Sequence, residues 1–137
     1  EVEFLERRLL PYMFPFKRQV QIACDNAKLG AMRLSGMEAP KHDDSEASFA
    51  DLKRRIDETL AYLATVTEAS YEGAHDRQIV LPYFKEKFLT GADYARTYLV
   101  PNFFFHVVVA YGLVRAAGVP VGKSDFTNGL PFRDLPV

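Results

Sequence analysis

The side chains best suited to chemistry in this sequence centre on His106. It is the only residue in the apolar run from Phe103 to Val114 whose side chain ordinarily titrates near neutral pH. Asn102 precedes it by one helical turn, which puts both side chains on one face of a helix. Gln19 or Gln21, from an earlier predicted helix, could complete a polar pocket around the imidazole. Such a pocket could bind a small molecule and move a proton on it.

Three interpretations of His106 stay open. The first is a core histidine whose ring nitrogens are satisfied by neighbouring polar groups, as buried polar groups generally are. The second is the small-ligand pocket described above. The third is a divalent metal such as Zn, Ni or Fe. Imidazole and thiolate are the ligands that zinc and nickel favour, so one histidine with two amides makes a weak ligand set. We therefore expect no cofactor, and a metal held by His106 is the alternative.

Asp25 and Tyr111 are two further candidates for the same pocket. Asp25 lies one turn after Gln21, and Tyr111 lies little more than one turn after His106. If they face one cavity, a His–Asp or His–Tyr couple could perform acid–base chemistry. The structural alternative is a solvated or ion-paired aspartate and a tyrosine that hydrogen-bonds at the edge of the core. We expect the structural alternative for both residues.

The remaining reactive residue types carry weaker signals. Cys24 lies on the apolar stripe of its helix, so we expect a buried and inert thiol. His42 and His75 lie in polar segments and are expected to be solvated. The segment Gly122 to Phe126 (GKSDF) lacks the glycine-rich lead-in of a phosphate loop. No GxSxG, HExxH, CxxC or Walker-type motif occurs in the sequence.

Hydrophobic periodicity predicts three long helices, over about residues 16–34, 49–66 and 93–117. A shorter helix over residues 1–10 should end at the prolines that follow it. The helix over 49–66 is the most clearly amphipathic. Its apolar stripe consists of Phe49, Leu52, Ile56, Leu60 and Leu63. Charged residues, Arg55 among them, fill the opposite side.

The last helix and the connections complete the predicted architecture. Pro101 should kink the last helix or split off its first turn. Because the helix is apolar nearly all round beyond Pro101, we expect it to be buried on most sides, with a fourth helical neighbour. Residues 37–46 are predicted to be an exposed connection and residues 78–90 a short irregular hairpin. The tail, residues 119–137, should be largely irregular.

Length, charge and composition narrow the class of protein. A chain of 137 residues with 48% hydrophobic and 26% charged residues is typical of one globular domain over residues 1–137. Its net charge of -1, with scattered Lys and Arg, argues against a nucleic-acid partner. The longest apolar run, 103–114, is too short to span a bilayer. With a single cysteine, these features predict a soluble cytoplasmic protein without a membrane partner.

Two segments carry a resemblance to a known family. They are PNFFFHVVVAYGLVRAAGVPVGKSDF (101–126) and MFPFKRQVQIACD (13–25). Together they resemble an uncharacterised bacterial and fungal family of the DinB/YfiT-like superfamily, and the similarity extends over essentially the whole chain. The resemblance implies an all-α, up-down-down-up four-helix bundle. In that family an additional N-terminal helix comes first, so we expect a first helix that is absent or truncated here.

The resemblance also implies where chemistry would lie. Many members of the superfamily bind a divalent metal through three histidines and act as thiol-dependent transferases or hydrolases. Arg115 and Gly118 match the end of the last helix, which places His106 at the second histidine position and Asn102 at the first. The third position falls near Gln19 or Gln21, in a helix without histidine. One ligand of three is therefore retained.

These observations lead to one functional hypothesis and one alternative. The hypothesis is a DinB-like bundle of unassigned function, with a degenerate metal site and a small polar pocket around His106. It would act as a homodimer, as the resemblance implies, and could bind a small molecule. The alternative is a metal-dependent, thiol-linked transferase or hydrolase of the DinB/YfiT type.

Overall fold

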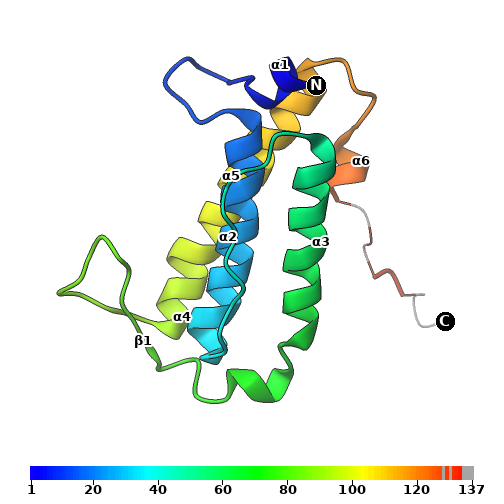
Figure 1. The fold of residues 1–137 in the computed structure, drawn as a ribbon. Coiled ribbons are helices and arrows are strands. Elements are labelled where there is room, and N and C mark those ends of the chain that lie inside the picture. Colours follow the sequence, from blue (N-terminus) through cyan, green and yellow to red (C-terminus); the bar gives the residue numbers. More distant parts are fainter. Residues whose placement is uncertain (128, 130, 134–137) are drawn as a thin grey trace.

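Three long helices form the body of the molecule (Figure 1). The computed structural model describes residues 1–127, 129 and 131–133. Helix α2 covers Phe16–Ser35, and helix α3 covers Phe49–Thr65. The third long helix runs without a break through α4 (Gly91–Asp93), η2 (Tyr94–Leu99) and α5 (Val100–Ala116). Helices α2 and α3 run in the same direction, and α5 runs antiparallel to both (Figure 1). The three long helices predicted from periodicity are confirmed.

Helix α2 is bounded by residues whose backbone geometry suits helix ends. Pro15 precedes its first turn, where a missing N–H costs nothing, and Gly36 ends it in the left-handed region at φ 77°. Within the helix, Gly30 lets the third long helix approach closely. A Cβ on Gly30 would come within 2.5 Å of Leu99 Cδ1. Small residues on α2 therefore set the distance between these two helices.

Helix α3 begins at a side-chain cap and has two different faces. The Ser48 hydroxyl accepts a hydrogen bond from the backbone N–H of Asp51. Arg55 and Thr59 are buried, although the sequence pattern grouped Arg55 with the charged side of the helix. In contrast, Leu60 from the apolar stripe is 58% exposed. The charge pattern was thus a wrong guide to which face of α3 is buried.

The third long helix is continuous through Pro101. The six residues before α5, Tyr94–Leu99, form a π-helical stretch. Proline lacks the N–H that would bond to the preceding turn, and a widened turn relieves the clash of its ring with that turn. The helix therefore accommodates Pro101 by a π-helical stretch just before it and continues without a break. By length and composition alone, the 26-residue helix Gly91–Ala116 could also cross a membrane.

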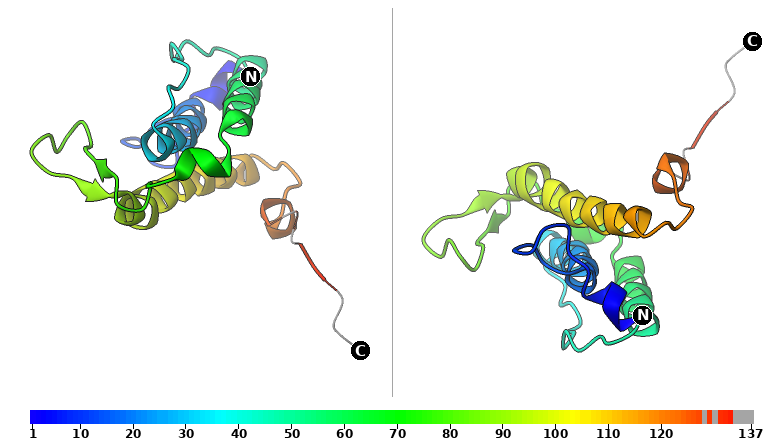
Figure 2. Two further views of the ribbon diagram at one scale, coloured as in Figure 1. Left: turned by 90° about the horizontal axis from the view of Figure 1, so that it is seen from below. Right: turned by 90° about the horizontal axis from the view of Figure 1, so that it is seen from above.

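A short antiparallel hairpin precedes this helix, as predicted. Strands β1 (Gln78–Ile79) and β2 (Leu89–Thr90) pair with Gln78 opposite Thr90. A small apolar cluster of Ile79, Leu81 and Tyr94 anchors the hairpin to the helix. Its tip projects away from the bundle (Figure 2). A turn of 3-10 helix, η1 (Glu68–Tyr71), connects α3 to the hairpin.

The two ends of the chain differ from what the sequence predicts or lie partly outside the described residues. Helix α1 covers only Val2–Leu5, so the helix predicted over residues 1–10 is wrong in extent. The tail contains one short helix, α6 (Lys123–Phe126), which follows Gly122. Residues 128, 130 and 134–137 of the predicted irregular tail lie outside the described residues.

An open apolar groove runs between α2, α3 and α5. Its volume is about 670 Å³, and apolar side chains form nearly all of its wall, including Ile56, Leu60, Phe104 and Val107. The prediction that α5 is buried on most sides is wrong for the described residues, because Phe104 and Val108 are about half exposed. In the part of the chain that the structure describes, no fourth long helix covers the groove. The fourth neighbour of α5 stays a prediction.

Candidate functional site

The interface between α2 and α5 contains the polar pair expected around His106. His106 is 7% exposed, and its Nδ1 lies 2.7 Å from Oε1 of Gln19. Gln19 Nε2 donates to the carbonyl oxygen of Phe14 at 3.0 Å. This second bond fixes the amide so that its oxygen faces the imidazole, and Nδ1 must then carry the proton. The neutral ring has its lone pair on Nε2.

A second polar pair lies in the same interface. Asn102 Nδ2 donates to Oδ1 of Asn26 at 2.8 Å. Asn26 Nδ2 is buried and has no hydrogen-bond partner among the described residues. Asn26 is not among the site residues expected from the sequence. It lies two turns after Gln19, and that spacing was the available signal, because it places both side chains on the face of α2 that meets α5.

The environment of His106 favours the uncharged ring. Burial is the larger cause that lowers its pKa from 6.5, and the positive charge of Arg18 lowers it further. Among the described residues, the hydrogen bond of the His106 ring is the one that Nδ1 makes with Gln19. Nε2 is therefore the one atom of the His106–Gln19 pair that could still accept a proton or a ligand.

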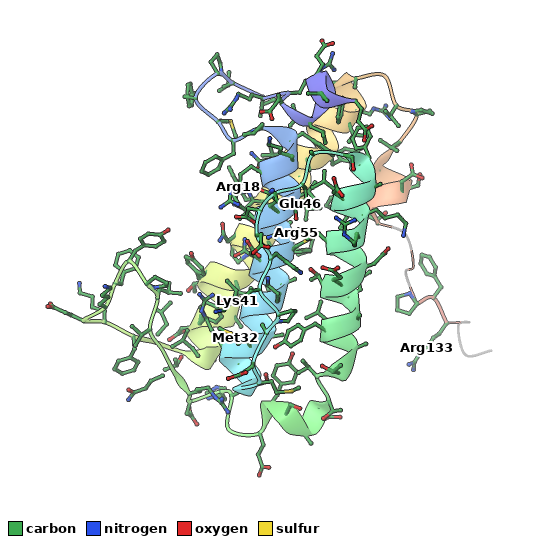
Figure 3. The ribbon with its side chains drawn as sticks, viewed as in Figure 1. Arg18, Met32, Lys41, Glu46, Arg55 and Arg133 are labelled. Atoms are coloured by element: carbon green, nitrogen blue, oxygen red, sulfur yellow. The ribbon has the colours of Figure 1, made fainter. Side chains whose placement is uncertain are left out.

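A larger polar cluster lies between α2, α3 and the connection that joins them (Figure 3). We call it the Arg55 cluster. Arg55 is 1% exposed and donates to three carboxylates. The distances are 2.8 Å to Asp25, 2.7 Å to Asp44 and 2.8 Å to Glu46. Since Asp44 and Glu46 belong to the connection, a segment predicted to be exposed is tied to the helices by a buried guanidinium.

Two of the predicted pocket residues belong to the Arg55 cluster. Gln21 Nε2 donates to Glu46 Oε2 at 2.7 Å, and Arg18 donates to Gln21 Oε1 at 3.1 Å. Asp25 is bonded to Arg55, as described above. Gln21 and Asp25 are therefore engaged with partners other than His106. Of the two glutamines considered from the sequence, Gln19 is the one that meets the imidazole.

His42 extends the Arg55 cluster, although it was predicted to be solvated. Its side chain is 7% exposed, with Nδ1 3.0 Å from Lys28 Nζ and Nε2 3.3 Å from Glu58. Lys28 also lies 3.3 Å from Asp25. Burial and then the charge of Lys28 lower the pKa of His42. The solvation predicted for His75 is confirmed, since its side chain is 79% exposed.

The ionisation states within the Arg55 cluster support one another. Burial alone would raise the pKa of Asp44 and of Glu46. Hydrogen bonds from Arg18 and Arg55 to Asp44, and from Arg55 to Glu46, outweigh it and lower both pKa values. For Arg55, burial is likewise outweighed by Glu46 and Asp25, and its pKa is raised. Asp44, Glu46 and Arg55 are therefore charged at neutral pH.

Tyr111 and Cys24 lie on the apolar groove. The Tyr111 ring packs edge-on against Phe126 of α6, with centroids 5.6 Å apart. Both Tyr111 and Cys24 line the groove, whereas His106 does not. Burial raises the pKa of the Cys24 thiol, although a hydrogen bond with Thr59 opposes this. The prediction of a buried thiol is confirmed.

The residues around His106 are a poor match for a divalent metal. The polar side chains one turn before it and across the interface are the amides Asn102 and Gln19, which are engaged with Asn26 and with His106 itself. Zinc, nickel and iron sites in proteins draw on several imidazole, thiolate or carboxylate donors. Among the described residues, no group of three or more His, Cys, Asp or Glu could hold a metal ion.

Comparisons with known proteins agree with the helical architecture. The profile of a family described as "Domain of unknown function (DUF1993)" matches residues 1–127. A crystal structure of a DinB family member protein from Shewanella denitrificans is 44% identical and superposes with a TM-score of 0.92. The alignment covers 96% of this chain and 75% of that one. No curated protein matches the chain. The predicted DinB-like helical bundle is thereby confirmed.

Proposed function

Since the chain belongs to the family described as a domain of unknown function, DUF1993, and has a DinB-like fold, we propose that it is a non-catalytic binding protein. In this proposal the position of a metal site is occupied by a polar pair that holds α2 against α5. The observation that carries it is the 2.7 Å contact between His106 Nδ1 and Gln19 Oε1. A glutamine that accepts from the imidazole and donates to a backbone carbonyl is an interior packing element.

The other polar candidates support the same proposal. Asn102 is engaged with Asn26, and Gln21 and Asp25 are engaged within the Arg55 cluster. A catalytic group must reach substrate, and these side chains reach one another instead. The small polar pocket expected around His106 is reduced in this proposal to Nε2 of the imidazole. It would contribute at most one hydrogen bond to a small ligand.

The alternative is a metal-dependent, thiol-linked transferase or hydrolase. The observation in its favour is the free lone pair on Nε2 of a neutral imidazole, because neutral histidine is the form that binds metals. The alternative requires further ligands from outside the described residues, since the neighbouring amides make a poor set.

Metal content decides between the two. The protein would be purified without a histidine tag and without chelator, beside His106→Ala and His75→Ala, and assayed by elemental analysis. His75 is the matched control, because its side chain is 79% exposed. Metal-free protein in all three samples supports the proposal. Near-stoichiometric Zn, Ni or Fe that is lost only in His106→Ala would overturn it and establish the alternative.

Stability separates a structural from a ligand-binding histidine. If His106 is a packing element, His106→Ala should lower the free energy of unfolding by about 1–3 kcal/mol, because Gln19 loses its partner in the interior. His75→Ala should leave it unchanged within about 0.5 kcal/mol, as is usual for exposed positions. Equal stability of both variants would contradict a packing role.

A further inference from the structure

The connection between α2 and α3 crosses the surface of α2 without regular structure. Because α2 and α3 point the same way, residues 37–48 run back along α2 towards the start of α3 (Figures 1 and 3). No residue between 38 and 46 takes part in a backbone–backbone hydrogen bond of the described chain. Side chains therefore hold residues 37–48, which we call the strap.

The strap is attached at two separate points. Asp44 and Glu46 bind the guanidinium of Arg55, as described above. His42 forms the other attachment, through the 3.0 Å contact between its Nδ1 and Nζ of Lys28 on α2. The side chains of His42 and Lys28 are 7% and 4% exposed. The two attachments differ in chemistry, because the one at His42 contains a group that ordinarily titrates near neutral pH.

The contact with Lys28 fixes which ring nitrogen of His42 carries the proton. An ammonium group can only donate, so Nδ1 must accept, and the proton of the neutral ring lies on Nε2. Nε2 is 3.3 Å from Oε2 of Glu58 but makes no hydrogen bond within the described chain. A second proton has to enter at Nδ1. It would set an N–H donor against the ammonium donor, with two positive charges 3.0 Å apart.

The other charged groups around His42 do not compensate for this clash. Lys28 on α2 and Arg55 on α3 disfavour the charged ring. Asp25 on α2 and Glu58 on α3 favour it. The Glu58 side chain is 52% exposed, so water screens its attraction, whereas Lys28 is shielded from water. Burial and then the charge of Lys28 are accordingly the largest causes that lower the pKa of His42.

We propose that the strap is a pH-sensitive switch, in which protonation of His42 breaks its contact with Lys28 and releases residues 37–43. Residues 44–48 stay in place, because the carboxylates of the Arg55 cluster keep their charges in mild acid. Release uncovers the Lys28 ammonium. The surface that α2 presents to a ligand then differs between neutral and mildly acidic solution, whether or not the protein is catalytic.

The size of the response follows from the binding of one proton. Below pH 6.5, His42 in the open strap binds the proton, whereas His42 in the closed strap does not. The ratio of open to closed strap should therefore rise by up to about tenfold per pH unit. The rise should end once the lower pKa of the closed state has been passed.

Cleavage after Glu38 by a glutamyl endopeptidase measures the open fraction of the strap. At each pH the rate is divided by that for a free peptide of residues 33–43, which removes the pH dependence of the protease. This ratio should rise between about pH 7.5 and about pH 5.5. His42→Gln should show no rise, because its amide oxygen accepts from Lys28 and does not titrate. His75→Gln is the matched control, since His75 is 79% exposed, and it should respond like the wild type.

Three outcomes of the cleavage experiment would overturn the proposal. One is a wild-type ratio that does not change with pH. Another is a response that persists in His42→Gln. The third is cleavage after Glu58 within α3 that rises in parallel with cleavage after Glu38, because acid would then loosen the whole bundle and not the strap.

NMR of the imidazole tests the atomic step without a protease. The ¹⁵N shifts of His42 at neutral pH should be those of a ring protonated at Nε2, and this form should persist below pH 6.5. Lys28→Gln should raise the pKa of His42 and weaken the cleavage response, because an amide oxygen can accept from a protonated Nδ1. A neutral wild-type ring protonated at Nδ1 would overturn the proposal. An unchanged cleavage response in Lys28→Gln would do the same.

Discussion

Nδ1 of His106 lies 2.7 Å from Oε1 of Gln19, a residue 87 positions earlier in the chain. The contact joins the only histidine of α5 to the face of α2 that also carries Asn26. The Gln19 amide accepts from His106 through its oxygen and donates to the carbonyl oxygen of Phe14 through its nitrogen. Interior polar groups connected in this way specify one arrangement of two helices, whereas an apolar interface tolerates several.

Gln19→Ala should destabilise the protein by about 1–3 kcal/mol, because it leaves Nδ1 of His106 and the Phe14 carbonyl without partners. Urea unfolding measures the loss. A double-mutant cycle with His106→Ala should give a coupling energy of about 0.5–3 kcal/mol. Strictly additive effects would mean that the two side chains do not interact in solution.

Arg55→Ala should be among the most damaging single substitutions, at about 3–5 kcal/mol, because Asp25, Asp44 and Glu46 would lose their shared buried counter-charge. Arg54→Ala is the matched control. Its side chain is 64% exposed and pairs with Asp51 at the surface, so it should cost at most about 1 kcal/mol. Similar melting temperatures for the two variants would refute the buried role of Arg55.

Loss of Arg55 should also release the connection between α2 and α3. Asp44 and Glu46 attach this segment to the helices through hydrogen bonds from Arg18, Gln21 and Arg55 to their carboxylates. Hydrogen exchange or limited proteolysis of Arg55→Ala should therefore find residues 37–48 opened before the helices. Protection in this segment equal to the wild type would contradict the mechanism.

Mild acid should destabilise the protein through its histidines. Burial, followed by the charges of Arg18 and Lys28, lowers the pKa values of His106 and His42 from 6.5. Below pH 6.5 the unfolded chain therefore binds more protons than the folded one. The free energy of unfolding should then fall with pH until the folded pKa values are passed. The slope between about pH 7 and pH 5 should be smaller in His42→Asn and in His106→Gln.

Stronger acid should act on the carboxylates of the Arg55 cluster. The folded pKa values of Asp44 and Glu46 lie below the ordinary 3.8 and 4.5. Their contribution is complete above the ordinary values and is lost as pH falls through the folded ones. In Asp44→Asn, the free energy of unfolding should fall less over this lower pH range than it does in the wild type. An acid transition identical to the wild type would contradict it.

Gly91→Ala should loosen the hairpin by about 1–3 kcal/mol, as overpacking against a rigid neighbour does. A Cβ at this position would collide with the carbonyl oxygen of Ala74, a backbone atom that cannot rotate away. The adjacent N–H of Ala92 bonds to His75 at 3.0 Å, so its hydrogen exchange reports the damage. Unchanged hydrogen exchange at Ala92 would contradict the prediction, because it would mean that the backbone shifts to fit the methyl group without destabilising the hairpin.

The boundaries of the helices could be predicted because their signals are local. Pro15 and Gly36 flank α2, and each has a backbone geometry that suits a helix end. Ser48 is the N-cap of α3, and its hydroxyl bonds to the backbone N–H three residues later. The burial of individual faces could not be predicted in the same way. Arg55 has the charge pattern of a solvated face, yet Asp44 and Glu46 of the connection bind it in the interior. His42 of the same connection contacts the buried Lys28.

The sequence by itself determined the all-helical bundle, the position of the hairpin and the interior position of His106. Periodicity and capping act within one or two turns, and so does the helical spacing that places His106 and Asn102 on one face. Tertiary structure alone decided that Gln19 meets His106, that Gln21 and Asp25 meet the Arg55 cluster, and that Tyr111 lies on the groove. A polar side chain is satisfied by any partner of suitable chemistry, and only the packing of helices brings one particular partner within reach.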